Sequence, residues 1–101
     1  MLVYNVTVKV DESIETEYLA WLKEIHVPDI ISTGCFTHAN IYQLLEIDDS
    51  EGPTYTIQYF TDSKSMYNQY LENFAEEMRQ KSFVRWGNKF IAFRTLMKVV
   101  N

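Results

Sequence analysis

The chain has 101 residues, of which 47% are hydrophobic and 23% charged, a composition that suits one globular domain and excludes a disordered segment. Its 14 acidic and 9 basic residues give a formal net charge of −5. This charge opposes binding to nucleic acid or to an anionic membrane surface, because both need clustered Lys and Arg. Aromatic residues make up 15% of the chain, so we expect some rings to serve an interface or a pocket beyond the core.

The first half of the chain predicts a strand followed by a helix. Residues 2–10 alternate between apolar and polar side chains, as in a strand with one face on a core. After it, Ser13 is the expected helix N-cap, and Tyr18, Trp21, Leu22 and Ile25 follow at helical spacing. We expect Pro28 to end or kink this helix near Val27, and Gly34 to cap the short turn that follows.

The second half predicts two further strands, a helix and a last strand. Residues 35–47 and 54–60 have strand character and are separated by the turn sequence of residues 48–53. A helix is expected from an N-cap at residues 61–63 to Gly87, and a fourth strand from Lys89 to Val100. The order β-α-β-β-α-β predicts one ferredoxin-like α+β domain over residues 1–101, a four-stranded antiparallel sheet with two helices on one face.

Two helices cover only one face of such a sheet, so the other face meets water or a partner. Faces assigned by apolarity place these residues on the uncovered side: Val3, Asn5, Thr7, Phe36, His38, Asn40, Tyr42, Thr56, Gln58, Phe60, Phe90, Ala92, Arg94 and Leu96. The rings in this set are Phe36, Tyr42, Phe60 and Phe90, and rings left in water favour aggregation. We therefore expect a homodimer formed through the uncovered face.

The polar members of this face form a candidate pocket for a small molecule, made of Asn5, His38, Asn40, Tyr42, Gln58 and Arg94. Convergent polar groups among rings are typical of such pockets. The alternative is a hydrogen-bonded network that fixes the register of the dimer. A guanidinium at Arg94 needs an anion, either a ligand carboxylate or phosphate or the carboxylate of Glu46.

Two histidines and one cysteine are the residues of the chain most suited to acid–base or metal chemistry. His26 is a candidate residue at the mouth of a pocket, and its alternative role is a cap at the negative end of the first helix. The spacing of the two His residues, Cys35 and the carboxylates matches no metal site. The single cysteine excludes an intrachain disulfide, and the chain shows neither a secretory signal nor an apolar run of the ~20 residues that span a bilayer. We expect a cytoplasmic protein without membrane contact.

The segments 4–8, 21–28, 55–59 and 92–96, together with the β-α-β-β-α-β order, resemble the dimeric α/β-barrel superfamily. Within it the chain is most similar to an uncharacterised family of proteins about one hundred residues long. The resemblance implies two subunits packed sheet on sheet into a barrel, with a pocket in the barrel or between sheet and helices. Haem-degrading members use an Asn, a Trp and a His, of which only Asn5 has a counterpart here, so no cofactor is expected.

These observations favour a homodimer that binds a small molecule, with cofactor-independent oxidation as a possible activity. The alternative is a non-enzymatic interaction module whose uncovered face serves only assembly. No catalytic residue is assigned from the sequence.

Overall fold

The computed structural model describes residues 1–101. In chain order its elements are β1 (Leu2–Val10), η1 (Glu12–Ile14), α1 (Glu15–Trp21), η2 (Leu22–His26), α2 (Val27–Ile31), β2 (His38–Gln43), β3 (Thr54–Thr61), α3 (Lys64–Asn73), α4 (Ala75–Trp86) and β4 (Phe90–Lys98). None of the helices is long and apolar enough to cross a membrane.

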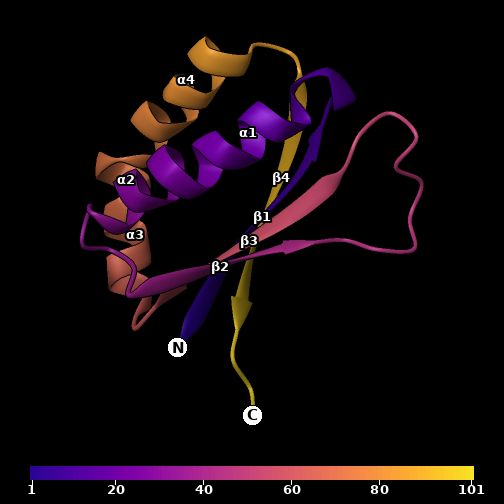
Figure 1. Cartoon of the computed structure of the whole chain (residues 1–101). Coiled ribbons are helices and arrows are strands. Elements are labelled where there is room, and N and C mark those ends of the chain that lie inside the picture. The colour runs from indigo at the N-terminus through magenta and orange to yellow at the C-terminus, as the bar shows by residue number, and fades with distance from the viewer.

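The four strands form one antiparallel sheet in the order β2-β3-β1-β4. All of the helices lie on the same side of this sheet, and the two chain ends lie close together at one end of it (Figure 1). The ferredoxin-like arrangement expected from the sequence is therefore confirmed. The sheet of a single chain is open, with β2 and β4 as its edges.

The core lies between the sheet and the helices. Tyr4 of β1 stacks on Phe36 with ring centroids 5.9 Å apart, and Phe36 meets Tyr70 of α3 at 4.9 Å. Phe36 is only 4% exposed and precedes β2, which begins at His38. The prediction that Phe36 lies in a strand on the uncovered face is thus wrong, because the chain enters β2 from below the helices and leaves this ring in the core.

The first helical segment begins two residues earlier than expected and does not end at Pro28. Asp11, rather than Ser13, is the first cap, and its side chain accepts a hydrogen bond from the backbone of Ser13 at 3.0 Å. Pro28 lies in the first turn of α2, where a missing N–H costs little. The segment ends before Gly34, whose φ of +80° is the left-handed conformation expected of a helix-terminating glycine.

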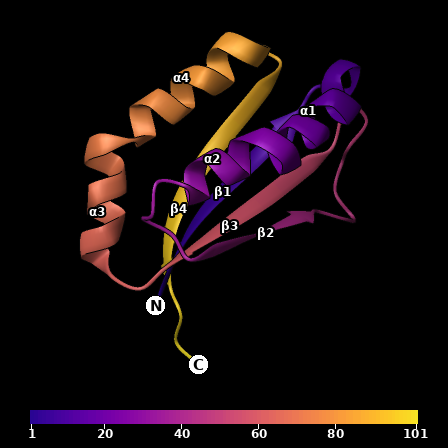
Figure 2. The ribbon, with the colours of Figure 1, turned by 60° about the vertical axis from the view of Figure 1, so that its left-hand side comes forward.

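The second helical segment is broken into two. Ser63 caps α3 as expected and accepts a hydrogen bond from the backbone of Met66 at 3.2 Å. Phe74 leaves helical geometry with a φ of −132°, and α3 and α4 meet there at an angle (Figure 2). The break lets α4 turn back across the sheet toward α1 and α2.

The loop between β2 and β3 is longer than expected, because β2 ends at Gln43 rather than at residue 47. Its tip extends away from the body of the molecule (Figure 1), whereas its base is fixed to β1. Gly52 has a φ of +141°, and a Cβ there would lie 1.9 Å from the carbonyl oxygen of Val10. Only glycine allows this close approach of the two backbones.

Candidate functional site

Five of the predicted site residues share the uncovered face of the sheet: Asn5, His38, Asn40, Tyr42 and Gln58. Asn40, Gln58 and Asn5 are neighbours in one cross-strand row, and His38 and Tyr42 lie in the rows on either side. The three side chains on β2 are exposed, and the other two are half-buried. In the single chain they therefore form part of an open surface.

Two contacts order this surface. Asn5 Nδ2 donates a hydrogen bond to Thr7 Oγ1 at 3.1 Å, and the ring of His38 stacks on Phe60 with centroids 4.4 Å apart and planes 4° apart. Phe60 and Tyr42 are the two rings that were correctly expected on this face.

Arg94, the sixth predicted pocket residue, lies on the other face. Its partner in the register is Val6, which faces the helices together with Tyr4 and Val8. Phe90, Ala92 and Leu96, the partners of Val10, Val8 and Tyr4, lie on that covered face as well. The predicted assignment of these four β4 residues to the uncovered face is wrong.

The error arises from the apolar pattern of β4. The residues that do lie on its uncovered side are Ile91, Phe93 and Met97, which are 59%, 66% and 37% exposed. Apolar residues mark the covered face only where the opposite face meets water. On β4 the uncovered side carries the larger apolar side chains, so apolarity selected the wrong face.

A cavity lies between the covered face and the helices. Its volume is ≈ 40 Å³, and twelve of the sixteen residues around it are hydrophobic, among them Tyr4, Tyr18 and Tyr70. The four others are His26, Arg79, Ser82 and Arg94. Polar groups from η2, α4 and β4 thus converge on a small, mostly apolar space, which is the usual composition of a ligand pocket.

A π-helical turn places His26 at this cavity. The backbone N–H of Val27 donates to the carbonyl of Leu22, five residues earlier, which widens the helix over Leu22–His26. Residues five apart then share one side of the helix, and the rings of Trp21 and His26 stack with centroids 4.5 Å apart. Such turns are frequent at functional sites.

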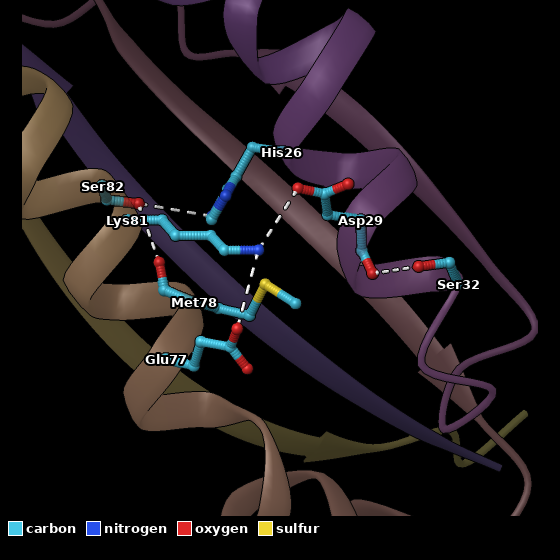
Figure 3. A network of polar contacts seen from close by, with 7 residues as sticks. All are labelled: His26, Asp29, Ser32, Glu77, Met78, Lys81 and Ser82. Carbon is cyan, nitrogen blue, oxygen red and sulfur yellow. Dashed lines mark hydrogen bonds and ion pairs between the residues drawn. The ribbon is translucent and has the colours of Figure 1, made fainter.

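Polar contacts hold the His26 ring, as Figure 3 shows. The Ser82 hydroxyl lies 3.4 Å from both the carbonyl oxygen of Met78 and His26 Nε2. A hydroxyl that donates to Met78 accepts from Nε2–H and leaves the ring lone pair on Nδ1, whereas a hydroxyl that donates to Nε2 leaves the ring proton on Nδ1. Nδ1 is buried and has no hydrogen-bond partner.

Burial lowers the pKa of His26 from 6.5 to about 4, with smaller contributions from the cations Lys81 and Arg94 and an opposing one from Asp29. At neutral pH the imidazole is therefore uncharged. It offers the cavity one ring nitrogen, Nδ1, that no protein group hydrogen-bonds.

Two tyrosines at the cavity, Tyr18 and Tyr70, are held in their neutral form. Burial raises the pKa of Tyr18 and Tyr70 well above the usual value, against a weaker opposing effect of Arg94 on both. Arg79 Nη2 donates to Tyr4 Oη at 3.3 Å and so connects α4 to β1. The positive charge of the cavity thus comes from two arginines, and the hydroxyl groups of Tyr18 and Tyr70 stay protonated.

Lys81 connects the two helical segments next to the cavity. Its Nζ lies 3.8 Å from Asp29 Oδ2 and 3.9 Å from Glu77 Oε1 (Figure 3). These are the two salt bridges of the structure, and their side chains are exposed, so their contribution to stability is small.

The sequence singled out His26 for a pocket mouth and Arg94 for a pocket on the other face of the sheet, and it predicted none of the remaining lining residues of this cavity as site residues. Arg79 was interpreted only as a charge at a helix end, and Ser82 gave no signal, because a single serine in a helix is unremarkable. Phe74 interrupts the helical pattern, but only the break itself shows that α4 folds back over His26. No group of three or more His, Cys, Asp and Glu side chains lies together in a way that could hold a metal ion.

The sequence profile of the family described as "Domain of unknown function (DUF4286)" matches residues 1–100. No curated protein sequence matches the chain.

Solved structures of the same fold are similar at low sequence identity. A dimeric ferredoxin-like protein from an uncultured marine organism superposes with a TM-score of 0.71 at 17% identity, over 100% of this chain and 96% of that one. A protein from Nitrosomonas europaea assigned to the antibiotic biosynthesis monooxygenases gives 0.68 at 13% identity, over 100% of both chains. SnoaB, a cofactor-independent oxygenase from Streptomyces nogalater, gives 0.65 at 12% identity, over 99% of this chain and 94% of SnoaB. At these identities the likeness shows the shared fold.

Proposed function

The chain belongs to the DUF4286 family, and from this premise we propose that it binds a small organic molecule in the cavity between sheet and helices, and that two copies assemble through their uncovered sheet faces. The observation that carries the binding function is the cavity itself. It combines an aromatic wall with a neutral His26, whose buried Nδ1 has no partner. A buried ring nitrogen without a partner costs free energy, which a ligand group that hydrogen-bonds to it recovers.

Filling the cavity tests this function. Ala92 is half-buried and lines the cavity, so Ala92→Phe should occupy it. Ala20→Phe adds the same ring on the exposed surface of α1 and serves as the matched control. In a protein-observed NMR screen of small organic molecules, we expect hits to shift the resonances of His26 and Tyr18 in the native chain and in Ala20→Phe. The same molecules should leave these resonances unchanged in Ala92→Phe. Hits that shift these resonances equally in Ala92→Phe, or a screen without hits, would contradict the proposal.

The homodimer is supported by the content of the uncovered face. Phe93, Ile91 and Tyr42 are 66%, 59% and 49% exposed there, and Asp and Glu are absent from its four strands. Two such faces can approach without the repulsion that a net charge of −5 would otherwise cause. Similar solved structures described as dimeric agree with this arrangement.

In the proposed dimer the row Asn40–Gln58–Asn5 lies inside the interface. Its amides can pair across the two sheets and fix their register, while the rings at its margins are removed from water. Closing the two open sheets against each other would give the barrel that the family resemblance implies.

A charge in this face tests the dimer. Phe93→Asp should convert the protein to a monomer at micromolar concentration in analytical ultracentrifugation. Phe83→Asp is the matched control, since Phe83 is 60% exposed on α4, away from the sheet face. A native chain that sediments as a monomer, or a dimer that survives Phe93→Asp, would refute this interface.

Cofactor-independent oxidation of the bound molecule is a second candidate function, favoured by the neutral imidazole in the cavity and by the fold shared with SnoaB. An oxygen electrode tests it with each NMR hit. Oxygen consumption in the native chain that is lost in Ala92→Phe supports oxidation of the bound molecule. Ligand binding without oxygen consumption supports a binding protein, and a dimer without any ligand supports the interaction module.

For the location we propose the cytoplasm, in keeping with the free thiol of Cys35, and cell fractionation tests it.

A further inference from the structure

The two edges of the sheet carry opposite charges. The loop that follows β2, residues 44–53 and from here the acidic loop, contains no Lys or Arg and four carboxylates, those of Glu46, Asp48, Asp49 and Glu51. Residues 89–98, which include all of β4, contain no Asp or Glu and three cations, those of Lys89, Arg94 and Lys98. Both salt bridges of the structure are made by Lys81, so neither set is paired within the chain.

The acidic loop and β4 are also the exposed edges of the molecule. Every residue from Leu44 to Glu51 is exposed, and the apolar side chain of Leu45 is 78% exposed. The loop extends from the β2 edge away from the body of the molecule (Figure 1). On the opposite edge, Phe93 of β4 is 66% exposed. Charged and apolar groups without partners thus lie together at both edges, where the backbone is also free to pair with another chain.

A dimer that stacks two such sheets face to face on a two-fold axis has two arrangements. An axis across the strands places β4 beside the β4 of the second copy, so three cations face three cations, and it leaves both acidic loops on the other edge without a cation. An axis along the strands places β2 and the acidic loop of each copy beside β4 of the other. Only this second arrangement is electrostatically complementary.

The strand directions suit the same arrangement. Three antiparallel pairings separate β2 from β4, so these two strands run in opposite directions. An axis along the strands preserves direction, so β2 and the β4 beside it are antiparallel and can share backbone hydrogen bonds. Such an axis also keeps each cross-strand row at its own level. The row from Asn40 to Thr95 then brings Asn40 of one copy beside Thr95 of the other.

Resting on the proposed homodimer, we infer that its two-fold axis runs along the strands and that each acidic loop docks on the basic β4 of a second copy of this chain. Both free edges of each sheet are then paired. The contact extends from the uncovered faces to the edges, and charge selects which edges meet.

Charge changes at the edges test this inference by sedimentation equilibrium of the full chain. Lys89→Gln/Lys98→Gln removes two cations of the basic edge and should weaken the dimer by about fivefold or more. An axis across the strands predicts the opposite sign, because the same change relieves repulsion between the two β4 strands. The matched control is Lys23→Gln/Lys64→Gln, which changes the net charge equally on the helical side, where both side chains are exposed. It should change the affinity by less than about twofold.

Cross-linking locates the edges directly. Asn40→Cys and Thr95→Cys, mixed and allowed to exchange subunits before a short bismaleimide is added, should give a cross-linked dimer with one chain of each variant. Each variant alone should give none. Cys35 is buried, so the native chain measures the background.

The outcomes separate this inference from the proposed function. Cross-links within each variant and not between them would overturn it, and so would a dimer that Lys89→Gln/Lys98→Gln strengthens or leaves unchanged. In both cases the homodimer through the uncovered faces still stands. A native chain that sediments as a monomer would overturn the homodimer and this inference together.

Discussion

On β3, Ile57 and Tyr59 are almost completely buried beneath the helices, whereas Thr56, Gln58 and Phe60 alternate with them on the uncovered side and remain half-buried. Here the two faces differ as in any sheet with one solvated face. At β4 the relation is reversed, because the uncovered side carries Phe93 and the covered side carries Arg94 at the cavity. The apolar side chains of a sheet therefore follow what each face contacts, whether core, ligand or partner, and this can change from one strand to the next.

The largest expected effect comes from truncating the covered face at its centre. Ile57 is 2% exposed, so Ile57→Ala should lower the free energy of unfolding by about 2–5 kcal/mol. Thr56→Ala, one residue along the same strand on the other face, is the control and should cost within about 1 kcal/mol. Urea denaturation measures both, and equal losses would mean that the two faces are buried alike.

The two histidines extend the comparison to pH, since His26 lies on the covered side and His38 on the uncovered one. The pKa of His26 falls from 6.5 to about 4 on folding because of burial, so between these values the unfolded chain binds the proton more readily. The contribution of the neutral imidazole to the free energy of unfolding is therefore complete above pH 6.5. It falls by up to about 3 kcal/mol as the pH drops toward 4.

Unfolding measured from pH 7.5 to pH 4 should show this slope in the native chain. His26→Gln should flatten it, whereas His38→Gln should leave it in place. A slope that persists in His26→Gln would assign the effect to other groups.

The smallest effect is expected at the salt bridges beside the cavity. Lys81→Met removes both pairs, with Asp29 and Glu77, whose side chains are exposed, and should change the free energy of unfolding by about 0.5 kcal/mol or less. Thermal unfolding at low and high salt measures it. A loss comparable to that of Ile57→Ala would show that the contact between α2 and α4 is a principal source of stability.

The sequence was sufficient for the order of elements and for the faces of β1, β2 and β3, because alternation and capping are local signals. It was insufficient to place Arg94 on the correct face of the sheet, since the face that an edge strand buries depends on the elements that pack against it. It was also insufficient for the cavity, whose residues lie on η2, α4 and β4 and meet only after α4 turns at Phe74. His26 could be suspected from its residue type, but its unpartnered Nδ1 depends on Ser82, fifty-six residues later.

The π-helical turn has a consequence for how this chain is compared with others. A π turn holds one residue more than the α-helical turn it replaces, so Leu22–His26 acts as a built-in single-residue insertion. Alignments to relatives with a continuous α-helix should place a one-residue gap here, and the imidazole will have no counterpart if the gap is misplaced. Deleting Lys23 should restore the α-helical repeat, keep the helix, and bring Trp21 and His26 to a spacing of four residues. Residues four apart share one face of an α-helix, so the stacked pair should survive the deletion, and the π turn marks a place where the chain length can differ by one residue without loss of this contact.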